Sequence, residues 1–201
     1  MINLLQERTI GDFSLNKVTL TKEIVEFAKF RARFHGDYYE VFDLKPGTYM
    51  RLMHNREIIM SNTPMEIRTT KEIIDKANGK VLLAGLGIGL IILPIQEKNN
   101  VKSVIIIEKH KEVIDLVADQ LPLNKKIRII HADIFEWLPE EREKFDTIYF
   151  DIWSGICSDN YEETKALHKR FRKYLNYKNP DRYMNSWRRE DFERLYFADK
   201  K

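Results

Sequence analysis

Apolar residues follow two different rhythms along the chain. Between residues 21 and 36 they recur at helical spacing, which predicts an amphipathic helix. The residues of this stripe are Ile24, Phe27, Ala28 and Phe34. From Lys80 onward, short continuous apolar runs alternate with helical patterns instead. The pattern of apolar residues therefore changes after the first third of the chain.

The segment that follows the first predicted helix reads as a set of short strands. Residues 38–44, 49–54 and 56–61 carry strand-forming residues, with turns at Pro46-Gly47 and Asn55-Arg56. We expect these strands to form a small antiparallel module that packs against the rest of the chain.

Continuous apolar runs mark the strands of the second region. They lie within residues 80–85, 101–108, 126–133 and 145–151, with helical patterns between them, a short one after residue 133 included. Residues 181–187 are the candidate for a fifth strand, and a last helix is expected over 189–197. Strands buried on both faces read as apolar runs, and their alternation with helices is typical of a doubly wound parallel sheet. The sequence ends about one helix after the fifth expected strand. We therefore expect either that this α/β sheet is truncated after its fifth strand or that a partner covers its edge.

Composition limits the classes of protein to consider. The chain has 201 residues, of which 43% are hydrophobic and 32% charged, enough for one substantial domain with a small appendage. A net charge of only +3 gives no strong general attraction to nucleic acid or membrane. The single cysteine, Cys157, excludes an internal disulfide framework. With no apolar run of membrane-spanning length and no signal-like start, we expect a soluble, cytoplasmic protein.

The first turn after residue 84 is rich in glycine. The stretch "VLLAGLGIGL" places Gly85, Gly87 and Gly89 at alternate positions. Such glycines permit a tight bend and a close approach of the backbone to a ligand. The dinucleotide template G-x-G-x-x-G would end at Leu90, so it does not apply. The alternative is a turn whose glycines serve only close packing of helix on strand.

Acidic residues end the next strands. Glu108, Asp133 and Asp151 follow apolar runs in order, and carboxyl ends of parallel strands meet at one edge of a sheet. A carboxylate such as Glu108 can accept two hydrogen bonds from a ribose diol. The alternative for Glu108 and Asp133 is that they cap the helices that follow them.

The G-x-G-x-G turn and the ordered acids over Val81 to Trp153 resemble the class I methyltransferases, which use S-adenosylmethionine (SAM). The small β module and the Asp at the end of the fourth strand make the chain most similar to the spermidine-synthase-like branch. The resemblance implies a Rossmann-like SAM-binding domain over 67–201, after a helix and β-hairpin module over 1–66. It implies cofactor contacts from Gly85, Gly87, Gly89, Glu108, Asp133 and Ile134, with Glu108 on the ribose and the last two residues on adenine.

The chain departs from these relatives at several positions. Leu83 and Ile88 stand where relatives carry acids, and "DIWSG" keeps Asp151 but loses the second Asp and the proline of the branch's signature. A charged amine needs convergent carboxylates or an aromatic cage, and the sequence offers only Asp151 and Trp153. A polyamine substrate is therefore poorly supported by the sequence.

The function indicated is SAM-dependent methyl transfer to a small-molecule acceptor. Asp151 would act as base or orient the acceptor, Trp153 would stack on it or pack under the next helix, and no metal site is predicted. The alternatives are an aminopropyltransferase and a binding module without turnover. RNA modification through the basic C-terminal region, with Arg170 and Arg172, is disfavoured because acidic residues dilute that region. A homo-oligomer remains open.

Overall fold

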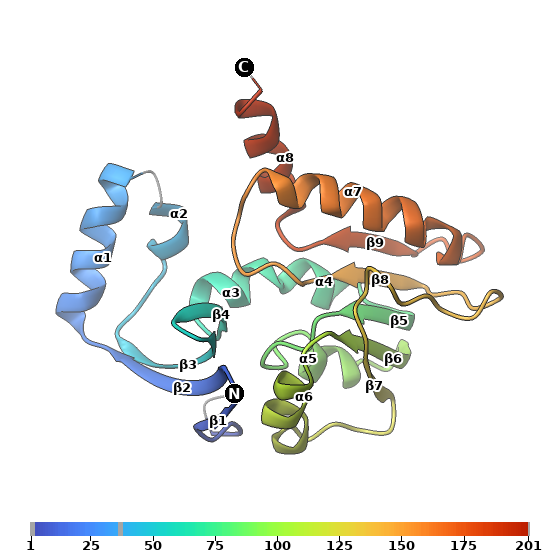
Figure 1. Ribbon diagram of the computed structural model, residues 1–201, viewed down its shortest axis with the longest axis horizontal. Coiled ribbons are helices and arrows are strands. Elements are labelled where there is room, and N and C mark those ends of the chain that lie inside the picture. The colour runs from blue at the N-terminus through green and yellow to red at the C-terminus, as the bar shows by residue number, and fades with distance from the viewer. Residues whose placement is uncertain (1–2, 36–37, 201) are drawn as a thin grey trace.

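The computed structural model describes residues 3–35 and 38–200, which form two sheets flanked by helices (Figure 1). One sheet is parallel and has the order β7-β6-β5-β8-β9. Its strands are β5 (Gly79–Ala84), β6 (Val101–Glu108), β7 (Ile127–His131), β8 (Thr147–Phe150) and β9 (Tyr183–Ser186). Every neighbouring pair in it is parallel. The predicted Rossmann-like, doubly wound α/β fold is confirmed, with the strand order reversing between β5 and β8.

Strand residues alternate between two hydrophobic clusters, one on each face of this sheet. Val81 and Leu83 belong to the first cluster, whereas Leu82 and Ala84 belong to the second. The first is covered by α4 (Lys71–Lys76), α5 (Ile92–Gln96) and α6 (Lys111–Val117), and the second by α7 (Asp159–Phe171). α8 (Arg189–Ala198) packs against α7. Because both faces are covered, the strands read as unbroken apolar runs in the sequence.

The segment after β7 does not form the predicted helix. Residues 134–136 make a turn that is held by backbone bonds from Glu136 and Trp137 to the carbonyl of Asp133, at 3.0 and 2.8 Å. The turn is also fastened from outside by the Arg170 guanidinium, which donates to the carbonyls of Phe135, Glu136 and Trp137.

The N-terminal region forms an antiparallel sheet with the order β1-β2-β3-β4. Its strands are β1 (Arg8–Ile10), β2 (Phe13–Leu20), β3 (Gly47–His54) and β4 (Glu57–Ser61). The predicted hairpin of β3 and β4 is confirmed, whereas β1 and β2 were not predicted. β2 pairs with β3 over its whole length and buries Phe13 and Leu15.

The prediction of a strand over residues 38–44 is wrong, because this segment contains the helical turn α2 (Tyr38–Val41). In this turn the rings of Tyr39 and Phe42 both lie 4.5 Å from the guanidinium of Arg68, which belongs to α3 (Pro64–Thr69). Glu40 pairs with Arg188 at 2.5 Å. These contacts require residues three apart to share a face, which a strand cannot provide.

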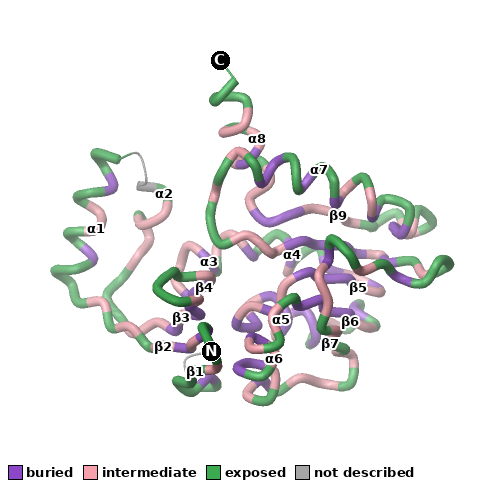
Figure 2. Tube along the Cα trace, in the orientation of Figure 1, coloured by how far each residue is buried: buried purple, intermediate pink, exposed green. Residues whose placement is uncertain are grey.

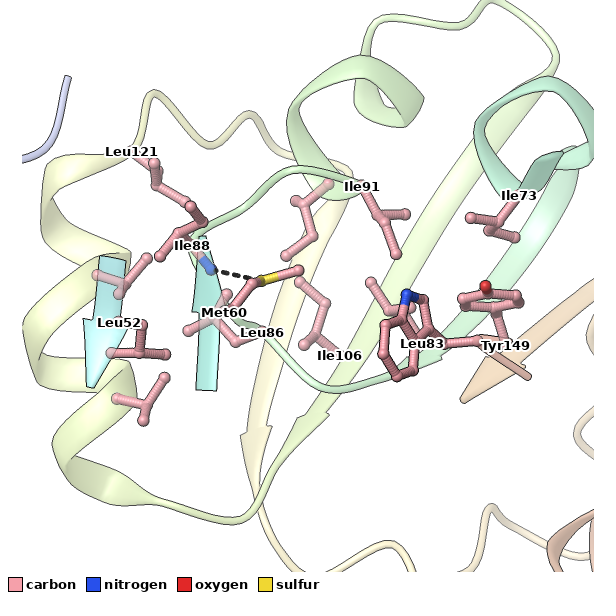
Figure 3. Close-up of a cluster of buried hydrophobic side chains, with 14 of the residues drawn as sticks. Leu52, Met60, Ile73, Leu83, Leu86, Ile88, Ile91, Ile106, Leu121 and Tyr149 are labelled. Atoms are coloured by element: carbon pink, nitrogen blue, oxygen red, sulfur yellow. Dashed lines mark hydrogen bonds between the residues drawn. The ribbon is translucent and has the colours of Figure 1, made fainter. Parts of the chain in front are cut away.

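The two sheets are joined through one hydrophobic cluster (Figure 3). Leu52 and Met60 of the antiparallel sheet pack beside Leu86 and Ile88 of the glycine-rich turn, and the Ile88 N–H donates to the Met60 sulfur at 3.4 Å. The expected boundary between residues 66 and 67 falls inside α3, so the division into 1–66 and 67–201 stays a prediction.

Burial is uneven along the chain (Figure 2). The central strands β5, β6 and β8 of the parallel sheet are largely buried, whereas α1 (Lys22–His35), at the left edge of Figure 1, is mostly exposed. Among the described helices, none is long and apolar enough to cross a membrane.

Candidate functional site

A cavity of about 340 Å³ lies at the carboxyl ends of β5, β6, β7 and β8. It lies where the strand order reverses, which is the usual ligand site in sheets of this kind. Most of the site residues predicted from the sequence line it, namely Gly85, Gly87, Glu108, Asp133, Ile134, Asp151 and Trp153. Gly89 is not among the lining residues.

The three glycines of the turn all have a positive φ, and a Cβ at each would lie close to other atoms of the chain. A Cβ on Gly85, whose φ is +99°, would lie 2.1 Å from the carbonyl oxygen of Asp151. At Gly87 it would lie 2.2 Å from the Met60 sulfur, and at Gly89 2.5 Å from a methyl group of Leu121. Packing against backbone requires glycine at position 85, whereas at Gly87 and Gly89 the neighbours are flexible side chains and the φ values of +51° and +85° favour glycine. Gly85 and Gly87 also form part of the cavity wall.

Glu108 holds the glycine turn against the start of α6. It is buried, with one oxygen accepting the Leu86 N–H at 2.9 Å and the other accepting the His110 N–H at 2.9 Å. A carboxylate oxygen has two acceptor positions, so each oxygen can still receive a hydrogen bond from a ligand hydroxyl.

Asp133 lies in a strongly polar surrounding at the end of β7. One oxygen accepts the Phe135 N–H at 2.9 Å, and the other pairs with the Lys109 ammonium at 2.9 Å. Burial acts to raise the pKa of Asp133, but Lys109 and the backbone N–H outweigh it, so the pKa is lowered. Ile134 follows and is buried.

Asp151 and Glu66 form the opposite side of the cavity. Burial raises the pKa of Asp151 to about 7. Glu66 comes from α3 and is only 9% exposed, and burial followed by repulsion from Asp151 raises its pKa to about 8 against a backbone hydrogen bond from Ser61. Glu66 was not predicted. It stands in the ordinary helical stretch "PMEIRT", where nothing in the pattern marks the glutamate as buried.

Two tryptophans complete this side of the cavity. The Trp153 indole donates to Glu163 at 2.7 Å and meets the Phe192 ring edge-on at 5.3 Å. Trp153 therefore both packs under the following helices and faces the cavity. The buried Trp187, which was not predicted as a site residue, donates to the Thr69 hydroxyl at 3.0 Å.

The N-terminal sheet supplies the remaining wall. Phe13 stacks on His54 with centroids 4.4 Å apart and an interplanar angle of 10°, and it contacts the His110 ring at 4.8 Å. Met60 lines the cavity beside Gly87. The antiparallel sheet is therefore part of the site.

Carboxyl side chains outnumber lysines around the cavity although the chain carries a net charge of +3. Among the described residues, six carboxyl side chains line it against one lysine, Lys109. The carboxyl groups belong to Glu57, Glu66, Glu108, Asp133, Asp151 and Glu163. This local excess favours a cationic ligand.

Three of the basic C-terminal residues, Arg170, Arg172 and Arg188, bind groups within the chain. Arg170 binds the turn after β7, as described above, and Arg172 donates to the Tyr177 hydroxyl at 3.2 Å. Arg188 pairs with Asp191 at 2.7 Å as well as with Glu40. These contacts do not favour a nucleic-acid surface. The described residues also contain no cluster of three or more metal-ligating side chains.

No protein-family model matches the chain. A search of curated proteins finds no significant match to its sequence.

Among solved structures, the chain is similar to the plantazolicin methyltransferase BpumL in complex with a monoazolic desmethylPZN analog and SAH. The identity is 18% and the TM-score 0.42, over 55% of this chain and 42% of that one. It is also similar to spermidine synthase from Thermotoga maritima, with 20% identity and a TM-score of 0.42, over 61% of this chain and 45% of that one.

A third match is the N-methyltransferase NodS from Bradyrhizobium japonicum WM9 in complex with SAH. The identity is 15% and the TM-score 0.44, over 56% of this chain and 58% of that one. The chain thus spans less than half the length of the first two proteins and less than two thirds of the third. Both kinds of protein that the sequence resembles are found among these matches, and each likeness is one of fold alone.

Proposed function

We propose that the cavity binds SAM and that the protein transfers its methyl group to a small acceptor. The observation that carries this proposal is the convergence of four neighbouring strand ends on one acid-lined cavity. Gly85, Glu108, Asp133 and Asp151 contribute one element from each strand. A volume of about 340 Å³ lies within the range of sites for small molecules and cofactors.

The residues at the ends of β5, β6 and β7 suit the nucleoside part. Glu108 is fixed by two backbone N–H groups, and its free acceptor positions suit a ribose diol. Asp133 stays ionised and can accept from an amino group, while Ile134 lies beside it. When bound, SAM supplies a methyl group that its own sulfonium has already activated. The acidic lining complements that positive charge.

Asp151 and Glu66 suit the acceptor. A base works best with a pKa near the working pH, and the pKa of Asp151, raised to about 7, meets that condition. Asp151 would hold the proton released by an amine or a hydroxyl. Glu66, with its pKa near 8, is mostly protonated at neutral pH and would donate a hydrogen bond to the acceptor.

Aminopropyl transfer is the second candidate, and a specific observation favours it. Glu66 and Trp187 add the second carboxyl and the second aromatic wall that the sequence did not offer for a charged amine. Decarboxylated SAM also lacks a carboxylate, which ionised carboxyl groups of the lining, Asp133 among them, would repel.

Thermal unfolding with added ligands tests both proposals. A ligand present at 100 times its Kd stabilises the folded state by about 2.7 kcal/mol, which raises the Tm of a chain of this length by about 5–10 °C. We expect SAM and its product S-adenosylhomocysteine to give such a shift and NAD to give none. A larger shift with decarboxylated SAM would favour aminopropyl transfer.

Two variants make the test specific. Glu108→Gln keeps the shape of the side chain but turns one acceptor oxygen into a donor, so we expect the SAM shift to fall by more than half. Glu97→Gln, at the exposed residue directly after α5, is the matched control and should keep the full shift. If NAD stabilises the protein and SAM does not, the proposal is wrong. Stabilisation without transfer of a labelled methyl group would identify a binding module.

A further inference from the structure

The helix α1 presents its apolar stripe to solvent instead of to the core. Val25 and Ala32, at 4% and 6% exposure, lie on the side that faces the protein. Four large apolar side chains lie on the other side, with exposures of 48% for Ile24, 62% for Phe27, 57% for Phe30 and 73% for Phe34. The stripe that looks like a core-facing surface in the sequence is therefore uncovered (Figure 2).

These side chains form one continuous surface along the helix. The rings of Phe30 and Phe34 meet edge-on at 5.0 Å, and the Arg31 guanidinium lies 6.0 Å from the Phe27 ring. Adjacent exposed apolar residues of this size on a folded chain mark a surface for another protein. α1 lies at the edge of the molecule in Figure 1, and none of its residues lines the cavity.

The charges beside the stripe identify the partner. The N-terminal half of α1 carries Glu23 and Glu26, with Lys22 paired to Glu26 at 3.8 Å, so its net charge is negative. The C-terminal half carries the basic residues Lys29, Arg31 and Arg33. Two copies of α1 that run in parallel would place like charges together. Two antiparallel copies would place the net negative half of each helix beside the net positive half of the other and would oppose their helix dipoles as well. The surface is thus complementary to itself in one orientation.

We propose that two copies of this chain dimerise through α1, with the helices antiparallel and Phe27 at the two-fold axis. In this register Phe27 packs on Phe27 of the partner subunit, and Ile24 packs on Phe30 of the partner subunit. Glu23 lies beside Arg31 of the partner subunit. By symmetry each of the last two contacts occurs twice, as an isologous interface requires.

Sedimentation equilibrium between 1 and 200 µM tests the proposal. The buffer contains a reducing agent, because Cys157 is exposed and could form a disulfide between copies. One helix from each copy makes a small interface, so we expect a concentration-dependent rise of the average mass toward twice that of the monomer. Phe27→Glu should remain monomeric at 200 µM. Phe197→Glu, at an exposed phenylalanine of α8, should associate like the wild type.

Charge reversal tests the orientation of the helices. Glu23→Lys and Arg31→Glu should each weaken the dimer about 10-fold, because each introduces two like-charge contacts. The double variant Glu23→Lys/Arg31→Glu restores opposite charges only in the antiparallel pair, so its dissociation constant should return to within about threefold of the wild type. A wild type that is monomeric at 200 µM, or a double variant weaker than either single one, overturns the proposal.

Discussion

Carboxyl groups on the two sides of the cavity lie in opposite environments. One side carries Asp133, and the other carries Asp151 and Glu66. Asp133 is held by the Lys109 ammonium and a backbone N–H, and its pKa is lowered. For Asp151 burial alone acts, and its pKa rises to about 7, while Glu66 beside it reaches about 8. One side therefore offers a fixed negative charge, and the other offers groups that exchange a proton near neutral pH.

This difference shows that the surroundings of a carboxyl group at a strand end, and not its position alone, determine its pKa. The hydrogen-bond donors around Asp133 replace the water it loses, whereas burial alone acts on Asp151. Glu66 accepts one hydrogen bond from the Ser61 backbone, but burial and repulsion from Asp151 outweigh it. The first environment suits recognition of a polar ligand, and the second suits acid–base chemistry.

The largest expected effect is a loss of stability on substitution of Gly85, which lies against Asp151 in the cavity wall. Gly85→Ala would put a methyl group 2.1 Å from the carbonyl oxygen of Asp151, at a backbone φ of +99° that L residues rarely adopt. Because β5 and β8 are neighbouring strands of the sheet, neither can move away easily. We expect a loss of about 4 kcal/mol or more in the free energy of unfolding, measured by urea denaturation.

The control for this variant is Gly155→Ala. A Cβ at Gly155 would have no heavy atom within 4 Å, so its cost should be small. Equal stabilities for the two variants would mean that β5 and β8 do not approach as closely as described.

The next effect separates the proton-exchanging side from the other. A carboxyl whose folded pKa is about 8 and whose ordinary value is 4.5 binds more protons in the folded than in the unfolded state between these pH values. Glu66 therefore favours the folded protein least at high pH, and its contribution is lost as the pH rises from about 4.5 to 8. Glu66→Gln should remove this loss and stabilise the protein at pH 9 by a few kcal/mol.

Unfolding curves at pH 5, 7 and 9 measure this effect. Glu57→Gln, at an exposed glutamate on the cavity wall, is the matched control and should follow the wild type. If the stability of Glu66→Gln declines with pH as steeply as that of the wild type, the pKa of Glu66 is not raised in the folded protein.

The smallest effect concerns the side with the fixed charge. Lys109→Ala removes the ammonium beside Asp133, so the pKa of Asp133 should rise. The Lys109 side chain is 63% exposed, and solvent screening limits the contribution to about 1 kcal/mol or less. A lowered pKa means that Asp133 stabilises the folded protein above its ordinary pKa and loses this contribution as the pH falls through its folded pKa. In Lys109→Ala the folded pKa is higher, so the loss should occur at a higher pH than in the wild type.

Carboxyl NMR titration in low salt measures the pKa of Asp133 directly. Lys111→Ala, which breaks an ion pair with Asp115 on α6, should leave that pKa unchanged. A pKa of Asp133 that does not move in Lys109→Ala would remove the basis for separating the two sides of the cavity.

The parallel sheet could be predicted because its signal is local. Continuous apolar runs such as "VIIIE" are long, and the glycines and acids stand directly at their ends. The α2 segment could not be predicted, because the aromatic residues that suggested a strand are held in a helical turn by Arg68 and Arg188, which are distant in sequence. In this segment, contacts with residues distant in sequence outweigh the strand propensity of the aromatic residues.

The candidate site was predictable to the same extent. Residues fixed by their position after a strand, such as Glu108 and Asp151, could be named from the sequence. Glu66 and Trp187 could not, because only the folded chain brings α3 and the segment after β9 to the cavity. The opposite pKa shifts of Asp133 and Asp151 were equally hidden, since both read as an acid after a strand.

The contact between Met60 and the glycine turn has a consequence for how the protein folds. The space that Gly87 leaves open is filled by the Met60 sulfur, and that sulfur accepts the Ile88 N–H. Because this contact joins the turn after β5 to β4, we expect the antiparallel sheet and the cavity to become ordered together. Local opening of the N-terminal sheet would release the amide of Ile88 to exchange with solvent and open the ligand site at the same moment.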